Sequence, residues 1–153
     1  TGGGWPSFYV EEHQSNAHTM AAQLTSLVLE GIPERFPDLK IVFIEGGFGW
    51  IPSATWRMDR HFEAFRSEVP HRKRRPSEYV KEHFWFTTQP IDEPDEGKHL
   101  RSLIDWVGAD RLLFSSDYPH WDFDDPRYAF RTPLTETERR KIFNGNARAL
   151  YKL

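Results

Sequence analysis

The run Arg111–Ser115 (RLLFS) is apolar and short enough for one β-strand, and Ser116 and Asp117 follow it directly. Two more runs have the same character, 40–44 (KIVFI) and 84–88 (FWFTT). Short, continuous apolar runs bounded by turn residues are typical of strands buried on both faces of a parallel sheet. We therefore predict three strands over these three ranges.

Segments with helical spacing separate the predicted strands. Apolar residues recur every three or four positions, or a capping signal is present, over 16–30, 50–65, 77–80, 100–107 and 135–143. The last of these helices opens on Thr135 and Glu138, which have the spacing of a capping box. Helices that alternate with short strands require parallel pairing through right-handed crossovers, so the predicted fold class is α/β.

The composition excludes several classes of protein. The chain has 153 residues, a formal net charge of -3 and no cysteine. The charge balance provides no basic field, so we expect no nucleic-acid partner. No apolar run approaches the roughly 20 residues of a membrane helix, so we expect no membrane partner. The lack of cysteine fits a reducing, cytoplasmic compartment and leaves histidine and carboxylates as the available metal ligands.

The residues that follow the predicted strands are the first candidates for a site. Ligands of parallel α/β folds bind at the carboxyl ends of the strands, and here those positions hold Glu45, 88–89 and Asp117. Asp117 also has an imidazole three residues further on, at His120. A carboxylate at this position can ligate a divalent cation, or it can simply cap the turn before Pro119.

Four segments, taken together and in order, carry a family resemblance: 36–42 (FPDLKIV), 45–47 (EGG), 111–120 (RLLFSSDYPH) and 144–151 (NGNARALY). They resemble the carboxyl-terminal half of the amidohydrolase-related metal-dependent hydrolases, a group that includes the aminocarboxymuconate-semialdehyde decarboxylase branch. The resemblance implies a partial (β/α)8 TIM barrel whose last three strands are the predicted ones. Residues 1–153 would form this half of the barrel domain, with a loop over 1–15 and helix-strand repeats over 16–153.

The resemblance also implies an active site with one divalent metal, usually zinc. Asp117 matches the last metal ligand of the family and would act as general base toward the metal-bound water. The His-x-His pair of the family would lie before Thr1, and the sixth barrel strand, which ends in His-Gly-Gly in many relatives, ends here in Glu45–Gly47. A catalytic zinc usually takes three protein ligands, so the isolated chain is expected to bind metal weakly.

Four residues are predicted to contact a small-molecule substrate. Glu45 would hold a substrate hydroxyl or a neighbouring histidine, unless it only forms a hydrogen bond or ion pair at the strand end. His120 would bind substrate or remain solvated, and Trp121 would line the pocket or only pack. His13 lies beside two glutamates in a loop that is expected to approach the site.

Two functions remain open from the sequence. The first is a metal-dependent hydrolase or decarboxylase that acts on a small carboxylated or cyclic substrate, with Asp117 as metal ligand and base. The second is a non-catalytic, truncated barrel fragment that is stabilised by self-association as a homo-oligomer, because open strand edges and an uncovered barrel interior must be paired or buried. Metal content and mass in solution distinguish the two.

Overall fold

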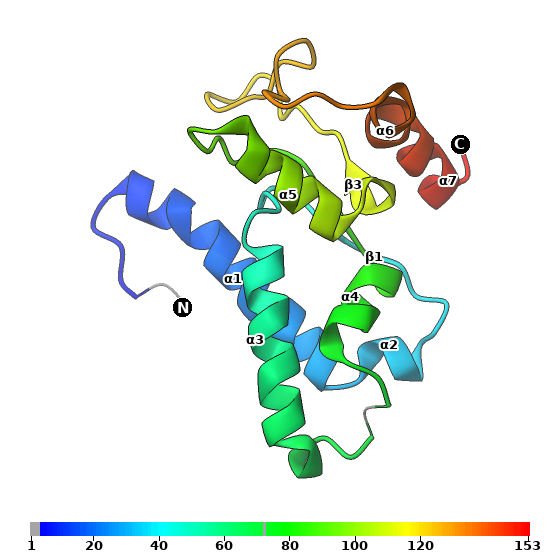
Figure 1. The fold of residues 1–153 in the computed structure, drawn as a ribbon. Coiled ribbons are helices and arrows are strands. Elements are labelled where there is room, and N and C mark those ends of the chain that lie inside the picture. Colours follow the sequence, from blue (N-terminus) through cyan, green and yellow to red (C-terminus); the bar gives the residue numbers. More distant parts are fainter. Residues whose placement is uncertain (1–3, 72) are drawn as a thin grey trace. The chain divides into compact units, whose positions relative to one another are not determined.

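The computed structural model describes residues 4–71 and 73–153, and Figure 1 shows its helices and strands. The chain divides into two compact units. The first comprises the chain up to Ile41 together with Trp50–Phe84, and the second comprises Val42–Gly49 together with Trp85–Leu153. Among the described residues, none of the helices combines the length and the apolar character that crossing a bilayer requires.

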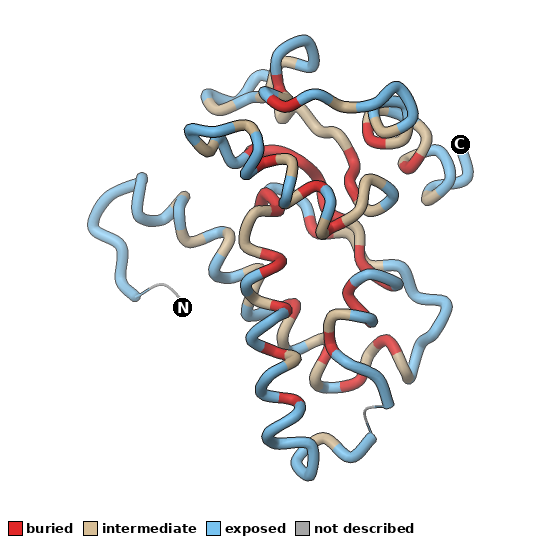
Figure 2. Tube along the Cα trace, viewed as in Figure 1, coloured by how far each residue is buried: buried red, intermediate tan, exposed pale blue. Residues whose placement is uncertain are grey.

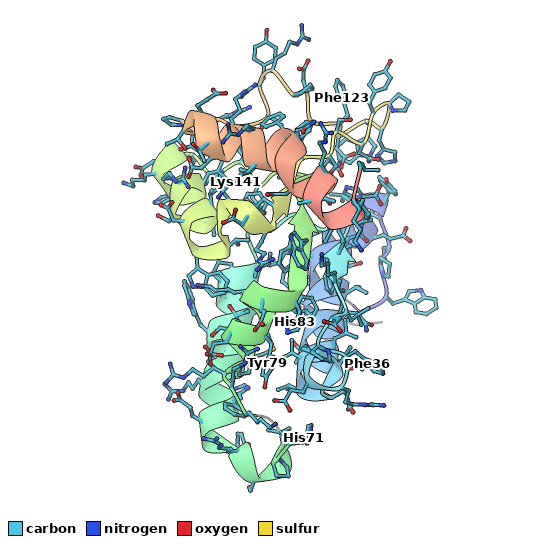
Figure 3. The ribbon with its side chains drawn as sticks, turned by 90° about the vertical axis from the view of Figure 1, so that its right-hand side faces the viewer. Phe36, His71, Tyr79, His83, Phe123 and Lys141 are labelled. Atoms are coloured by element: carbon cyan, nitrogen blue, oxygen red, sulfur yellow. The ribbon has the colours of Figure 1, made fainter. Side chains whose placement is uncertain are left out.

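The first unit is helical. Its elements are α1 (Tyr9–Leu29), α2 (Ile32–Arg35), α3 (Ile51–Ala64), the 3-10 turn η1 (Arg66–Glu68) and α4 (Pro76–His83). Helix α3 lies against α1 and α4 (Figure 1). Its buried positions Ile51, Thr55, Met58 and Phe62 recur at helical spacing, as the red segments of Figure 2 show. On α4, His83 is buried one turn beyond Tyr79 (Figure 3), and the two ring centroids lie 6.4 Å apart.

Helix α1 begins at Tyr9 rather than at residue 16, so the loop predicted over 1–15 is wrong from Tyr9 onward. Residues 1–3 of that predicted loop lie outside the described residues. The Glu11 carboxylate accepts hydrogen bonds from the backbone N–H groups of Ser7 at 2.6 Å and Phe8 at 3.0 Å. This polar cap starts the helix before its apolar spacing begins, and a search for apolar periodicity does not detect it.

The described residues form one sheet of three parallel strands in the order β1-β2-β3. The strands are β1 (Ile41–Phe43), β2 (Phe84–Thr87) and β3 (Leu112–Leu113), each inside its predicted range. The second unit contains β3 and all but the first residue of β1 and β2. The α/β prediction is confirmed. The prediction that 40–44 is buried on both faces is wrong at Lys40 and Ile44, which flank β1 rather than belong to it and are exposed.

The helices of the second unit lie in the chain between β2 and β3 and after β3. They are α5 (Gly97–Val107), the 3-10 turn η2 (Ala109–Arg111), α6 (Glu136–Arg140), the π-helical turn η3 (Lys141–Gly145) and α7 (Asn146–Tyr151). The predicted capping box is confirmed. The Glu138 N–H donates to Thr135 Oγ1 at 3.2 Å, and the Thr135 N–H donates to Glu138 Oε2 at 2.8 Å.

The carboxyl-terminal helices anchor β3. Asn146 Nδ2 donates to the carbonyl oxygens of Ala109 and Leu112, both at 2.7 Å. Just beyond the strand, the Phe114 N–H donates to the carbonyl oxygen of Ile142 at 2.9 Å. The Asn146 bonds hold the start of β3, and the bond from Phe114 holds the chain just after its end.

Candidate functional site

Three metal-ligating side chains meet in the loop after β3. The donor atoms of Asp117, His120 and Asp122 all lie within 4.8 Å of one another. His120 Nδ1 lies 3.6 Å from Asp117 Oδ2 and 2.7 Å from Asp122 Oδ1. The Asp122 side chain is only 11% exposed, whereas that of His120 is 48% exposed. Two carboxylates and one imidazole suit a divalent cation such as zinc or manganese.

A tight loop brings these residues together. Asp117 has a φ of +56°, the left-handed region that aspartate tolerates better than most non-glycine residues. The backbone N–H of His120 then donates to the carbonyl oxygen of Asp117 at 2.8 Å, and that of Asp124 donates to the carbonyl oxygen of Ser116 at 2.9 Å. The loop also carries Phe123, labelled in Figure 3. The chain therefore reverses immediately after the strand and returns beside the Asp117 carboxylate.

The surroundings of His120 favour its protonated form. The hydrogen bond with Asp122 raises the pKa of His120 above its ordinary value; loss of hydration acts against it, and the negative charges of Asp117, Asp122 and Glu45 raise the pKa further. Both nitrogens of a protonated imidazole donate hydrogen bonds. With Nδ1 directed to Asp122, the second donor is Nε2, which suits an anionic ligand.

Glu45 follows β1 and is also in a left-handed conformation, with a φ of +62°. Its backbone N–H donates to Thr87 Oγ1 at 3.1 Å, which ties the end of β1 to the end of β2. Its charge contributes to the raised pKa of His120. Glu45 therefore belongs to the same electrostatic environment as the loop after β3.

The other two predicted site residues, Trp121 and His13, lie outside the cluster of Asp117, His120 and Asp122. Trp121 is exposed, and its ring centroid lies 6.4 Å from that of His120. His13 is on α1 in the first unit, with its ring 5.6 Å from that of Tyr9, and its role in the site stays a prediction. Asp122 was not singled out from the sequence. Its position two residues beyond His120, in the same polar loop, was the available signal.

Asp124, in the same loop, is also electrostatically perturbed. Burial raises its pKa from an ordinary 3.8 to about 6, although the hydrogen bond that its Oδ2 accepts from the Ile91 N–H at 3.0 Å acts against this. The charges of Glu93 and Asp122 raise the pKa further. The folded chain therefore binds this proton more tightly than the unfolded chain does.

Replacement of this group, Asp124→Asn, is expected to stabilise the fold only at higher pH. Above about pH 6 the ionised Asp124 carboxylate lowers the free energy of unfolding by its full amount. This destabilisation disappears below pH 3.8, the pKa of the group in the unfolded chain. Because the group is only partly buried, we expect a gain of roughly 1 kcal/mol in the free energy of unfolding at pH 7.5 and none at pH 3.5. Urea denaturation at the two pH values measures this difference.

A neighbouring carboxylate serves as the control, because its pKa changes in the opposite direction. Hydrogen bonds from Arg127 hold the pKa of Asp125 down at about 2. Asp125→Asn should therefore lose stability at pH 7.5 rather than gain it. An equal gain for Asp124→Asn at both pH values would show that the Asp124 carboxyl titrates normally.

Comparison with known proteins identifies relatives over most of the chain. Residues 7–153 match the family described as Amidohydrolase. The gamma-resorcylate decarboxylase of Polaromonas sp. (strain JS666 / ATCC BAA-500) is 34% identical over 139 residues, which cover 87% of this chain and 40% of that protein. The gamma-resorcylate decarboxylase of Rhizobium sp. (strain MTP-10005) is 34% identical over 143 residues, 90% of this chain and 41% of that protein.

A solved structure also matches. The crystal structure of a dihydroxybenzoic acid decarboxylase from Polaromonas sp. JS666, with bound manganese and the inhibitor 2-nitroresorcinol, has a TM-score of 0.71 and 30% identity. The match covers 90% of this chain and 41% of that chain. This chain therefore spans about 40% of the length of the curated relatives it matches. The prediction of a partial barrel is confirmed by this likeness.

Proposed function

The chain belongs to the amidohydrolase family, and on this premise we propose that it forms the Asp117-bearing part of a divalent-metal-dependent decarboxylase. The observation that carries the proposal is the cluster of Asp117, His120 and Asp122 at the carboxyl end of β3. The relatives named above are decarboxylases, which favours loss of CO2 over hydrolysis. We propose a hydroxylated benzoic acid as the substrate class, within the small carboxylated or cyclic compounds that the sequence indicated.

The residues of the cluster fit a divalent cation in both chemistry and spacing. Asp117 is the ligand we assign to the cation, and Asp122 presents a further carboxylate oxygen within 4.8 Å, whereas His120 is assigned to the substrate. When bound, the cation supplies positive charge that stabilises negative charge on substrate oxygen atoms. The metal expected from the sequence was zinc, whereas the Polaromonas decarboxylase structure holds manganese. Metal analysis of the purified protein distinguishes the two.

The remaining side chains are assigned to the substrate. His120, held through Nδ1 by Asp122, binds the substrate carboxylate through Nε2. Glu45 accepts a hydrogen bond from a ring hydroxyl, and Trp121 packs against the aromatic ring. In the reaction, the bond between the ring carbon and the carboxyl carbon breaks, CO2 leaves, and a proton takes its place on the ring carbon.

Binding of 2-nitroresorcinol tests the proposal, because this inhibitor of the Polaromonas decarboxylase absorbs visible light. The full chain with Mn²⁺ is expected to change the absorption spectrum of the compound, and the chain without metal is not. The protein that carries this chain is expected to release CO2 from gamma-resorcylate. Since the isolated chain is expected to bind metal weakly, Mn²⁺ is supplied in large excess. A lack of any Mn²⁺-dependent spectral change in the protein that carries this chain would overturn the proposal, and a product that gains water but keeps its carboxyl group would identify a hydrolase.

We also propose that the chain associates with itself. Large apolar side chains are exposed in both units, among them Phe8, Val10 and Tyr118, the last 74% exposed. Exposed apolar surface favours association. Mass measured by sedimentation, together with metal content, separates the two functions. An oligomer that holds metal supports the decarboxylase, and a metal-free oligomer supports a non-catalytic barrel fragment.

A further inference from the structure

The six residues Thr87–Asp92, which we term the strand-end segment, comprise the last ladder residue of the central strand β2 and the five residues that follow it. Three consecutive polar side chains begin it, and all are buried: Thr87, Thr88 and Gln89, the last only 1% exposed. Burial of polar groups is unfavourable unless hydrogen bonds compensate for the lost water. The partners of this segment therefore indicate why polar residues occupy it.

One set of contacts reaches the loop after β1. Thr87 Oγ1 accepts from the Glu45 N–H at 3.1 Å, and Asp92 Oδ2 accepts from the Gly49 N–H at 2.8 Å. Between them, the carbonyl oxygen of Pro90 comes so close to Gly47 that a Cβ there would lie only 2.8 Å from it. The strand-end segment thus holds the loop of Glu45 at three points.

A second set of contacts reaches the loop after β3. Thr88 Oγ1 accepts from the Ser115 N–H at 3.3 Å, and Ile91 N–H donates to Asp124 Oδ2 at 3.0 Å. Gln89 Nε2 donates to the carbonyl oxygen of Asp122 at 3.3 Å. The same short segment therefore also holds the loop that carries the metal-ligating cluster, and Gln89 contacts that cluster most directly.

The side-chain amide of Gln89 is only partly satisfied by hydrogen bonds, which is unfavourable for the stability of the fold. Within residues 4–71 and 73–153, its Oε1 is buried with no hydrogen-bond partner. An unsatisfied buried carbonyl destabilises the folded state. The other end of the same amide binds Asp122, whose carboxylate in turn binds His120 Nδ1 at 2.7 Å.

We infer that Gln89 is a positioning residue, which holds Asp122 so that the Asp122 carboxylate orients the His120 imidazole toward Asp117. The inference rests on the proposed function, because it names what keeps the proposed metal and substrate site in place. Groups that orient the ligands of a metal typically change its affinity by about 10–100-fold when they are removed. Gln89 acts through Asp122, so the lower end of that range applies.

The test replaces the amide with an apolar side chain of similar length, Gln89→Met. The amide protons of His120 and Asp124, which are bonded within the loop, are expected to exchange with solvent about tenfold faster, and the Kd for Mn²⁺ is expected to rise about tenfold. The melting temperature is expected to stay unchanged or to rise, because the substitution also removes the unsatisfied Oε1. Hydrogen exchange, Mn²⁺ titration and thermal unfolding of the full chain supply the three readouts.

The matched control is Asn146, whose side-chain amide is also buried and donates a hydrogen bond to a residue of β3. Asn146 binds the carbonyl oxygens of Ala109 and Leu112, at the opposite end of β3 from the cluster, so Asn146→Leu should lower the melting temperature and leave the Kd for Mn²⁺ unchanged. If Gln89→Met does not fold, Gln89→Asn keeps the amide but is too short to reach Asp122, and the same faster exchange is expected.

The outcomes separate the inference from the proposed function. A Gln89 variant with a lower melting temperature and no selective exchange in residues 117–124 would overturn the inference. A wild-type chain that binds no Mn²⁺ even in a large excess of the metal would overturn the proposed function, while the exchange measurement still decides whether Gln89 positions the loop.

Discussion

Asp117→Asn is expected to lower the affinity of the full chain for Mn²⁺ by at least about a hundredfold. Loss of a group that only hydrogen-bonds a metal ligand already lowers metal affinity by about 10–100-fold, and Asp117 is proposed to be a ligand itself. The substitution replaces a charged oxygen by a neutral amide at the residue that faces His120 at 3.6 Å. Binding of 2-nitroresorcinol should disappear with the metal. Isothermal titration with Mn²⁺ and the absorption of the inhibitor measure both losses.

Asp125→Asn provides the matched control for this result. Asp125 lies in the same loop, but its carboxylate pairs with Arg127 at 2.5 Å and is not part of the cluster. Its replacement should change the Mn²⁺ affinity by no more than about twofold, because loss of an exposed ion pair has only a small energetic effect and Asp125 is not one of the proposed ligands. Equal loss in both variants would mean that the loop binds cations only through its overall charge, and unchanged binding in Asp117→Asn would remove Asp117 from the site.

Gly47→Ala is expected to reduce the free energy of unfolding by about 3 kcal/mol, the largest stability change we predict. Two effects combine at this position. Gly47 has a φ of +59°, where a side chain is strained, and a Cβ there would lie 2.8 Å from the carbonyl oxygen of Pro90. Because backbone must move to relieve this contact, the loop of Glu45 should shift as well. Urea denaturation measures the loss of stability, and inhibitor binding reports the shift of the loop.

Gly145→Ala is the control for the same chemical change without strain. Gly145 has a helical φ of -61°, and a Cβ there would lie 3.4 Å from the Arg140 carbonyl oxygen, an ordinary contact. Alanine is favoured over glycine in helical conformations, so stability should stay within about 0.5 kcal/mol or rise slightly. A Gly47→Ala variant as stable as Gly145→Ala would show that the loop after β1 moves freely away from Pro90.

Much of the fold was accessible from local patterns. Continuous apolar runs indicated β1, β2 and β3, because a strand buried on both faces needs apolar side chains at successive positions. Helical spacing indicated α3 and α5, because a helix buried on one face needs them every three or four positions. The start of α1 was missed, since it depends on the Glu11 side chain capping the backbone of Ser7 and Phe8. Polar caps leave no periodic signal.

The candidate site was accessible in part for the same reason. Ligands of parallel α/β folds bind at the carboxyl ends of the strands, so Glu45 and Asp117 were both candidates, and His120 was included through its short spacing from Asp117. The charge of Glu45 acts on His120 in the folded chain, as this reasoning requires. Asp122 was missed, although its carboxylate lies closer to His120 Nδ1 than that of Asp117 does.

The amino-acid sequence by itself determined the α/β class, the three strands, the family resemblance and the position of Asp117 after the last strand. These properties depend on residues that are close in the chain, where spacing and burial are directly coupled. Only the tertiary structure decided that Asp122 orients His120 and that Thr87–Asp92 holds the loops on both sides of it. The contacts of Thr87 with Glu45 and of Gln89 with Asp122 join residues more than 30 positions apart, and the loop reversal brings Asp122 back to His120; strand register and loop geometry, rather than any local pattern, set these partners.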